Sequence, residues 1–300
     1  RLPASSLRPL PAAVMPEPPS LHQLHSRQFE TNRYVYPVIS RRSRGLSVGI
    51  NLNPDKICNF DCIYCQVDRT VPSTTRSVDL PVLLRELDEL LADAASGAIF
   101  EHPKFRLTPP DRRRINDIAF AGDGEPTTHR EFDRVVAEVA AAKARHHLTQ
   151  VKLVLITNAS MFHRPVVRRG LELLDQNQGE IWAKLEAGTA AYYEQIDRTS
   201  IPFRQILENI TAAAQVRPLV IQALFMRVAG AAPPDSELAE WIRRLEEIRA
   251  AGGQLSLIQV YTVARRPAEE YVTSLSDGEL EAIAQRARAA GFAAEVFGAA

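Results

Sequence analysis

Strand-like and helix-like segments alternate along most of this 300-residue chain, beginning near residue 46. Short apolar runs rich in β-branched residues predict strands at 46–52, 116–122, 151–157, 181–187, 219–228 and 255–263. Amphipathic stretches predict helices at 79–96, 131–147, 164–176, 190–215 and 235–251, followed by a helix near 277–290 and a short strand near 292–297. Such alternation favours parallel strands joined by right-handed crossovers. The sequence therefore predicts one curved α/β sheet, either a partial barrel or a doubly wound sheet.

The composition is that of a water-soluble globular protein. Hydrophobic residues make up 45% of the chain, and no apolar run approaches the length of about 20 residues that a membrane-spanning helix needs. The 36 basic and 36 acidic residues balance, so net charge predicts no general attraction to nucleic acid or membrane. We expect a disordered segment at 1–20 with translation beginning at Met15, an N-terminal extension at 21–45, and one domain from 46 to 300. Residues 98–114 are expected to form an exposed insertion within that domain.

All three cysteines of the chain, Cys58, Cys62 and Cys65, fall within eight residues, directly after the first expected strand. An odd number of cysteines so closely spaced is not a disulfide framework and indicates a shared metal or redox role. Iron–sulfur clusters are held by cysteine thiolates, normally four for a complete [4Fe–4S] site. Three thiolates would leave one iron open, and an open metal position is where chemistry occurs. Thiolate ligands also favour a reducing, cytoplasmic location.

A structural zinc site is the alternative interpretation of the three cysteines. It needs a fourth ligand, which a histidine elsewhere in the fold would have to supply. Zinc sites usually pair two C-x2-C type knuckles, and this chain has no second pair. The C-x3-C-x2-C spacing therefore favours an iron–sulfur cluster.

Polar motifs also follow the later strands. The segment FAGDGEP (120–126) ends the second expected strand, where Gly122 and Gly124 permit close backbone approach and Pro126 fixes the turn. Asn158 follows the third strand. Lys184 and Glu186 share one face of the fourth, as catalytic candidates or as a strand-end ion pair. Weaker candidates for cavity contacts are Gln259, Tyr261 and Arg265, and the arginine runs 41–44 and 112–114 are either solvated surface or contacts to RNA phosphates.

The cysteine spacing, with the aromatic Tyr64 before the last cysteine, resembles the signature of the radical S-adenosylmethionine (SAM) superfamily. This resemblance implies a (βα)6 partial TIM barrel and a [4Fe–4S] cluster whose open iron is chelated by SAM. One-electron reduction would then cleave SAM to methionine and a 5′-deoxyadenosyl radical, which abstracts hydrogen from a substrate. The resemblance places Tyr64 near the adenine. It also assigns Gly124, Glu125 and Pro126 to the SAM amino group, with Gly122 and Asn158 as further cofactor contacts.

Two longer stretches, 33–69 and 120–129, resemble a bacterial branch related to the wyosine-synthesis enzymes, which rebuild a guanine in phenylalanine tRNA. Those enzymes carry a second cluster on additional cysteines, and this chain has none left. Three hypotheses follow for the function. The chain acts on tRNA or another nucleic-acid-derived substrate, it activates a glycyl-radical enzyme or modifies a peptide, or it binds a structural metal without catalysis. For the two enzymatic hypotheses we expect a one-electron donor such as flavodoxin or ferredoxin and no membrane partner.

Overall fold

The computed structural model describes residues 29–298, so the expectations for residues 1–20 and for Met15 lie outside the described residues. An eight-stranded sheet organises the molecule, in the spatial order β1-β2-β3-β4-β5-β6-β8-β10. Its strands are β1 (Val35–Ser40), β2 (Gly45–Ile50), β3 (Ile115–Phe120), β4 (Lys152–Thr157), β5 (Gly179–Lys184), β6 (Leu219–Leu224), β8 (Leu255–Tyr261) and β10 (Ala294–Phe297). β1 pairs with β2 antiparallel, and every other pairing in the sheet is parallel.

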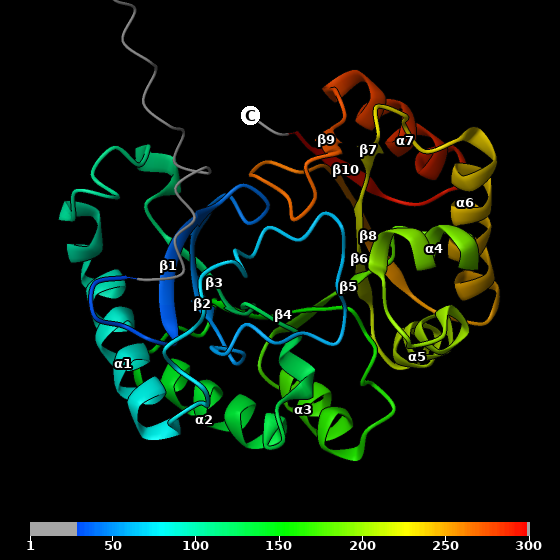
Figure 1. Ribbon diagram of the computed structural model, residues 1–300. Coiled ribbons are helices and arrows are strands. Elements are labelled where there is room, and N and C mark those ends of the chain that lie inside the picture. Colours follow the sequence, from blue (N-terminus) through cyan, green and yellow to red (C-terminus); the bar gives the residue numbers. More distant parts are fainter. Residues whose placement is uncertain (1–28, 299–300) are drawn as a thin grey trace, which may run out of the picture.

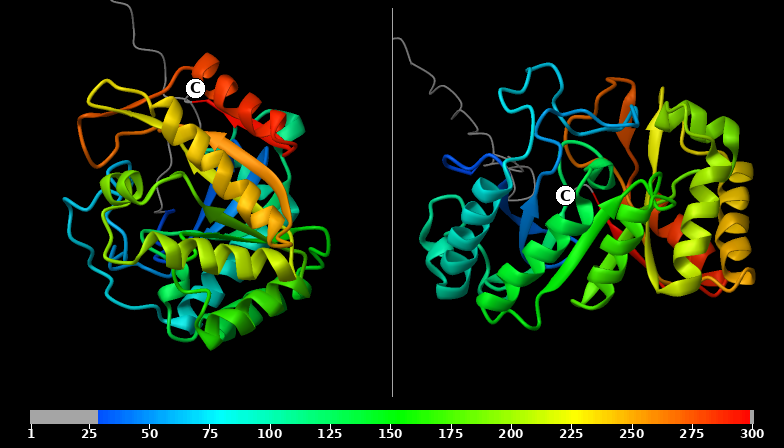
Figure 2. Two further views of the ribbon diagram at one scale, coloured as in Figure 1. Left: turned by 90° about the vertical axis from the view of Figure 1, so that its right-hand side faces the viewer. Right: turned by 90° about the horizontal axis from the view of Figure 1, so that it is seen from below.

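The sheet is curved, and the helices lie on its outer face (Figures 1 and 2). These helices are α1 (Leu80–Ser96), α2 (Phe132–Arg145), α3 (Pro165–Asp175), α4 (Ala190–Asp197), α5 (Phe203–Val216), α6 (Asp235–Ala250) and α7 (Asp277–Ala289), with short 3-10 turns η1 (Ala98–Glu101), η2 (Pro110–Arg112) and η3 (Pro126–Thr128). Because neighbouring parallel strands follow one another in the chain and the helices cover one face, the partial barrel is confirmed over the doubly wound sheet.

The main core lies between the sheet and its helices. Helix α1 shows how the sequence specifies it, because its apolar stripe, including Leu83, Leu87 and Leu90, is buried against the sheet. The Asp79 side chain accepts a hydrogen bond from the amide of Val82 at the start of this helix. Gly97 ends it in the left-handed conformation with φ of 82°.

The inner face of the sheet has a separate and much smaller apolar layer. It consists of Ala119, Val154, Trp182 and Val220, one residue from each of β3, β4, β5 and β6. Side chains of parallel-barrel strands alternate between the outer core and the interior. Above this layer, toward the carboxyl ends of the strands, the inward positions become polar, and this is where the functional site lies.

Four local expectations differ from the structure. The expected strand 219–228 is interrupted at Phe225, after which β7 (Met226–Val228) pairs antiparallel with β9 (Val272–Ser274). The expected helix 190–215 is broken into α4 and α5, because Arg198 takes a left-handed conformation and Pro202 begins the second helix. The expected extension 21–45 contributes β1 to the sheet.

The fourth difference concerns the expected insertion at 98–114. Its residues Ile99, Phe100 and Phe105 are buried, so it is wrong to regard the segment as an exposed insertion throughout. Other parts of the segment match the expectation, since Leu107 is 77% exposed and residues 109–111 are exposed as well. The segment is a packed connection between α1 and β3, because its aromatic residues need apolar cover.

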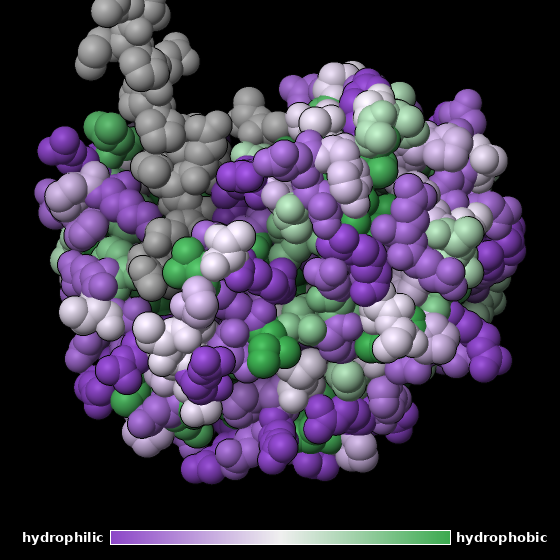
Figure 3. Space-filling model, in the orientation of Figure 1, coloured by the Kyte–Doolittle hydropathy of each residue, from purple (hydrophilic) through white to green (hydrophobic). Residues whose placement is uncertain are grey.

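The surface seen in the orientation of Figure 1 is mainly hydrophilic, with apolar residues scattered over it (Figure 3). No helix within residues 29–298 is long and apolar enough to cross a membrane.

Candidate active site

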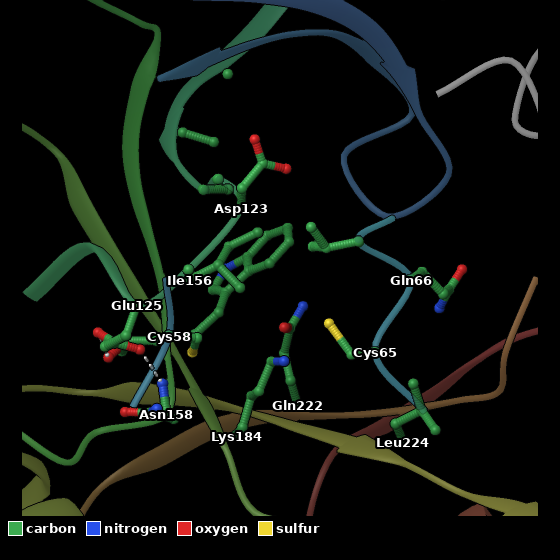
Figure 4. A pocket seen from close by; sticks show the side chains of 18 of the residues that line it. Cys58, Cys65, Gln66, Asp123, Glu125, Ile156, Asn158, Lys184, Gln222 and Leu224 are labelled. Atoms are coloured by element: carbon green, nitrogen blue, oxygen red, sulfur yellow. Dashed lines mark hydrogen bonds between the residues drawn. The ribbon is translucent and has the colours of Figure 1, made fainter. Parts of the chain in front are cut away.

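A pocket with a volume of about 220 Å³ opens where the carboxyl ends of the central strands meet. All three cysteines line it, together with the GDGEP loop after β3 and inward side chains of β4, β5 and β6. In Figure 4, the side chains of Lys184 and Gln222 extend into the pocket between those of Cys58 and Cys65. The motifs that lie far apart in the sequence therefore meet at one site.

The cysteine loop has no regular secondary structure, and distant segments hold its backbone in place. The amide of Ile63 donates to the carbonyl of Ile196 at 2.9 Å, and the carbonyl of Ile63 accepts from the amide of Glu269 at 3.1 Å. The Thr199 hydroxyl donates to the carbonyl of Asn59 at 2.9 Å. Because these bonds satisfy backbone groups on both sides of Cys62, the loop has a fixed conformation before any ligand binds.

The thiols experience both burial and nearby cations. Burial raises the pKa of Cys58, and it raises the pKa of Cys62 well above its usual range, so both thiols favour the neutral form. Arg69 Nη1 lies 2.8 Å from Cys65 Sγ and offers a positive charge to that sulfur. The Lys184 ammonium lowers the pKa of Cys58 and of Cys62, which opposes the effect of burial. Two cations are thus available to offset thiolate charge when a metal displaces the protons.

The donor set fits an iron–sulfur cluster better than a single zinc ion. The three cysteines are free thiols on one pocket, and no histidine is among the described residues that line it. Within residues 29–298, no three His, Cys, Asp or Glu side chains form a group that could hold one metal ion. A closed zinc site needs four ligands around one ion, whereas a cluster takes its thiolates on separate irons.

Glu125 of the GDGEP loop is buried, and its carboxylate accepts four hydrogen bonds from the chain. Its Oε1 accepts from the amide and hydroxyl of Thr127 and, at 2.6 Å, from the hydroxyl of Thr157, while Oε2 accepts from the amide of Asn158 at 2.7 Å. A carboxylate offers about four acceptor sites. Burial raises the pKa of Glu125, and these four donors oppose that rise. The side chain therefore ties the end of β3 to the end of β4.

Gly122 and Gly124 allow the GDGEP loop to approach its neighbours. A Cβ at position 122 would lie 2.2 Å from Oδ1 of Asn51, and one at position 124 would lie 2.2 Å from the carbonyl oxygen of Ile57. Both contacts are impossible for a larger residue unless the backbone moves. The expected close approach therefore occurs, and it joins this loop to the end of β2 and to the cysteine loop.

Asn51, which sequence reasoning did not select, completes that junction. Its Oδ1 accepts from the amide of Asp123 at 3.0 Å, and its Nδ2 donates to Asp123 Oδ2 at 2.7 Å. Asn158 has a similar role across the pocket, because its Nδ2 donates to Oδ1 of Asn59 at 2.9 Å. Gly122, Gly124, Glu125 and Asn158 all line the pocket, whereas Pro126 is buried behind it.

Lys184 ends β5 and Glu186 follows two residues later, but the two side chains do not pair. No ion pair joins them within residues 29–298, and each borders a small second cavity beside the main pocket. Burial lowers the pKa of Lys184, whereas negative charge on the neighbouring Tyr261 and on the thiols, when these groups ionise, raises it, and the net direction is upward. Burial and the neighbouring Asp197 raise the pKa of Glu186, whose Oε1 has no hydrogen-bond partner within the described residues.

Tyr64 lies at the boundary between the cysteine loop and this charged group. Its hydroxyl donates to Asp197 Oδ1 at 3.2 Å, and the Lys184 Nζ lies 5.5 Å from the centre of its ring. The ring lines the pocket and is 3% exposed. Tyr64 is therefore placed to contact a ligand with its ring while its hydroxyl is held by the protein.

Other pocket residues were missed or only weakly indicated by the sequence. Tyr261 and Arg265 line the pocket, but Gln259 does not and instead accepts a hydrogen bond from Gln222 at 2.9 Å. Arg42 and Trp182 also line the pocket. The sequence indicated Arg42 only as part of an arginine run at the surface or in contact with RNA, and no motif indicated Trp182. A partial signal existed for Trp182, because it alternates with Lys184 on β5 and so faces the same side.

Comparison with known proteins gives a consistent result. The sequence model of the radical SAM superfamily matches residues 52–228, more than half of the chain, including the cysteine loop and the GDGEP loop. A UPF0026 protein of Helicobacter pylori strain J99 is 25% identical over 246 residues, which cover 81% of this chain and 70% of that protein. A protein of Brachyspira hyodysenteriae named GTPase Obg is 25% identical over 271 residues, or 88% of this chain. The chain spans only 35% of the length of that relative.

Two solved structures share the fold. A radical SAM methyltransferase from Sphaerobacter thermophilus superposes with a TM-score of 0.60 at 13% identity, covering 88% of this chain and 69% of that chain. A structure of TYW1 with a lysine-pyruvate adduct bound gives a TM-score of 0.50 at 12% identity, covering 82% of this chain and 74% of that chain. These similarities confirm the expected partial TIM barrel.

Proposed function

The chain belongs to the radical SAM superfamily, and we propose that it is an enzyme that cleaves SAM reductively at a [4Fe–4S] cluster bound by Cys58, Cys62 and Cys65. The observation that carries this proposal is the convergence on one pocket of the three thiols, the GDGEP loop and Lys184, which forms no ion pair with the described residues. Members of the superfamily in general use SAM and such a cluster. This chain supplies three thiolates, as the spacing predicts, and leaves room beside them in the pocket for the cofactor.

When bound, a [4Fe–4S] cluster with one open iron supplies the electron that breaks the C5′–S bond of SAM into methionine and a carbon radical able to abstract hydrogen. The chain's contribution is to bind, orient and balance charge. Cys58 and Cys65 face the pocket from different sides, and Arg69 and Lys184 offset the negative charge of the thiolates.

We assign Lys184 to the carboxylate of SAM. Its ammonium is held inside the pocket, protonated, without a hydrogen bond or ion pair to the described residues. Lys184 is half-buried, and a cation partly removed from water without a counter-ion is stabilised by an anionic ligand. Glu186 borders only the adjoining small cavity, so the proposal keeps it as a neighbour of Lys184 and gives it no contact with SAM.

The GDGEP loop has a divided role in this proposal. Because the Glu125 carboxylate already accepts four hydrogen bonds from the chain, three of them on Oε1, we assign the SAM amino group to the backbone carbonyls of Gly122 and Gly124. Glu125 fixes the position of those carbonyls. Tyr64 offers its ring to the adenine, and Asn158 holds the rim near the cysteine loop.

The proposal is tested first by cluster loading. Anaerobic reconstitution should give about four iron and four sulfide per chain, and addition of SAM should change the EPR spectrum of the reduced cluster. Cys58→Ala, Cys62→Ala and Cys65→Ala should each lose the cluster. Ile57→Ala, at a position that is 65% exposed and adjacent to Cys58, should retain it. About one zinc per chain and no sulfide would support the structural-metal hypothesis instead.

The identities of the substrate and of the electron donor are predictions from the sequence alone. TYW1 is similar in fold, and the arginine run at 41–44 suggested contacts to tRNA, but Arg42 of that run lines the pocket. No observation favours tRNA over a protein substrate, or flavodoxin over ferredoxin. The interior of the pocket is the better guide to the substrate.

A further inference from the structure

The pocket does not end at the thiols but continues into the interior of the barrel. Positions of β2, of β3 and of the residue after β3 carry small side chains that line the pocket, namely Ser47, Gly49, Ala119 and Ala121. Gly49 is needed there because a Cβ would lie 2.3 Å from the ring of Tyr36. These small side chains leave an inner chamber, bounded at its far end by Arg42, Asp117 and Trp182.

Arg42 reaches this chamber from the turn between β1 and β2. Arg41 holds this turn by donating to the carbonyl of Gly298, and the exposed Arg44 lies 3.7 Å from the carboxylate of Glu295, a surface pair that contributes little. Both partners follow or belong to β10, the opposite edge strand of the sheet. The turn thus bridges the two edges of the partial barrel. Its first and last arginines are engaged at that seam, and Arg42 lines the chamber.

The guanidinium of Arg42 is positioned by two aromatic rings. Its Cζ lies 5.3 Å from the ring centre of Trp182 and 5.2 Å from that of Tyr261. It forms no hydrogen bond or ion pair with residues 29–298. Contact with aromatic rings fixes the guanidinium while leaving its N–H donors at the edge unused.

The nearest buried carboxyl group does not neutralise this cation. Asp117 accepts a hydrogen bond from Ser47 instead of forming an ion pair with Arg42. Burial raises the pKa of Asp117, which favours its uncharged form, although the hydrogen bond from Ser47 and the charge of Arg42 act in the other direction. A second unsatisfied group belongs to the same pocket nearer the thiols, because Oε1 of the fully buried Gln222 has no partner within the described residues.

We infer that the inner chamber is a substrate subsite for an oxyanion, a carboxylate or a phosphate, which the Arg42 guanidinium binds through its free N–H donors. This inference rests on the proposed function, since the chamber is a substrate site only if SAM chemistry occurs at the thiols. An arginine fork matches planar carboxylate and phosphate oxygens. The amide oxygen of Gln222 would accept an N–H or O–H of the same molecule, leaving the part nearer the thiols for reaction.

The test is anion binding by the reconstituted, SAM-loaded protein, measured by isothermal titration calorimetry. Malonate and inorganic phosphate are the probes, and uncharged malonamide is the neutral comparison. We expect saturable binding of at least one anion, weakened about ten- to hundredfold by Arg42→Gln, because charge-assisted hydrogen bonds are lost. Arg44→Gln is the matched control, since Arg44 lies in the same turn with a side chain that is 69% exposed, and it should bind within about twofold of the wild type.

Arg42→Lys guards against loss of folding, because it keeps the charge but not the planar fork. It should bind malonate more weakly than the wild type, while anion binding should change the tryptophan fluorescence of the wild type through Trp182. Preference for malonate identifies a carboxylate substrate, and preference for phosphate a phosphorylated one.

Two results would overturn the inference. One is the absence of saturable anion binding to wild-type protein that carries its cluster and cleaves SAM. The other is equal anion affinity in Arg42→Gln and Arg44→Gln, which would place the anion elsewhere, for example at Lys184. If the proposed function itself is wrong, the wild-type protein in the same preparation will lack the cluster or leave SAM intact. That result differs from both results that overturn the inference about the anion.

Discussion

The two sides of the pocket differ in how their polar side chains are satisfied. On the side of β2, β3 and β4, hydrogen bonds of 2.7 to 3.0 Å join the loops that follow the strands. They link Asn51 to Asp123, Asn158 to Glu125 and Asn158 to Asn59. On the side of β5, β6 and the β1–β2 turn, Lys184, Gln222 and Arg42 each keep at least one polar group without a hydrogen-bond partner among residues 29–298. The first side is a preassembled scaffold. The second holds groups that need ligands.

The largest effect on stability is expected from the saturated side. Glu125→Ala would leave the amides of Thr127 and Asn158 and the hydroxyl of Thr157 without their acceptor in a buried setting. We expect the free energy of unfolding to fall by about 3–5 kcal/mol in urea titrations. Glu131→Ala removes an exposed partner of Arg134 and should cost less than about 1 kcal/mol. Equal losses in the two variants would mean that the scaffold does not depend on Glu125.

The opposite outcome is expected for Lys184, on the unsatisfied side. Lys184→Met should leave the stability of the cluster-free protein unchanged or raise it, because the amine has no counter-ion there. It should weaken SAM binding to the reconstituted protein by about 1.5–3 kcal/mol, measured by calorimetry. The matched control is Lys152→Met on β4, whose amine pairs with Glu180, and SAM affinity should be unaffected. A strongly destabilised Lys184→Met variant with normal SAM affinity would contradict the comparison.

A smaller, pH-dependent effect is expected at Asp117. Because burial raises its pKa, the folded state keeps this proton at pH values where the unfolded chain has lost it. The stability from this group is therefore present below about pH 4 and is lost as the pH rises through the raised pKa. Asp117→Asn should gain stability relative to the wild type by about 1 kcal/mol or less between pH 4 and pH 8.

Urea titrations at several pH values check this prediction for Asp117. Asp111→Asn, at an exposed position in η2, should follow the pH dependence of the wild type. A difference between Asp117→Asn and wild type that shrinks with rising pH would show that the carboxylate form is the stabilising one.

The scaffold side was largely predictable from the sequence, and the reason is local. The cysteines, Gly122, Gly124 and Asn158 directly follow strands whose apolar pattern is clear, and parallel strands bring such positions to one edge. The saturation of Glu125 was not predictable, because the Thr157 and Asn158 donors come from the next βα unit.

The ligand side depends on long-range closure of the barrel, which a pattern along the chain does not encode. Arg42 lies in an arginine run typical of surface, and it faces the chamber because the turn reaches β10 across the open edge. Strand β1 contains a proline and precedes the regular alternation, so it was not predicted. Pro202 is a sequence signal for the break between α4 and α5, but the helical periodicity on both sides of it favoured one continuous helix.

The central claim is that the three thiols and the pocket beside them form a site for reductive cleavage of SAM. The most direct measurement is the amount of 5′-deoxyadenosine formed by anaerobically reconstituted protein with SAM and a chemical reductant. We predict its formation by the wild type and its loss in Cys58→Ala, Cys62→Ala and Cys65→Ala. Reduced wild-type protein with a full complement of iron and sulfide that leaves SAM intact would contradict the claim.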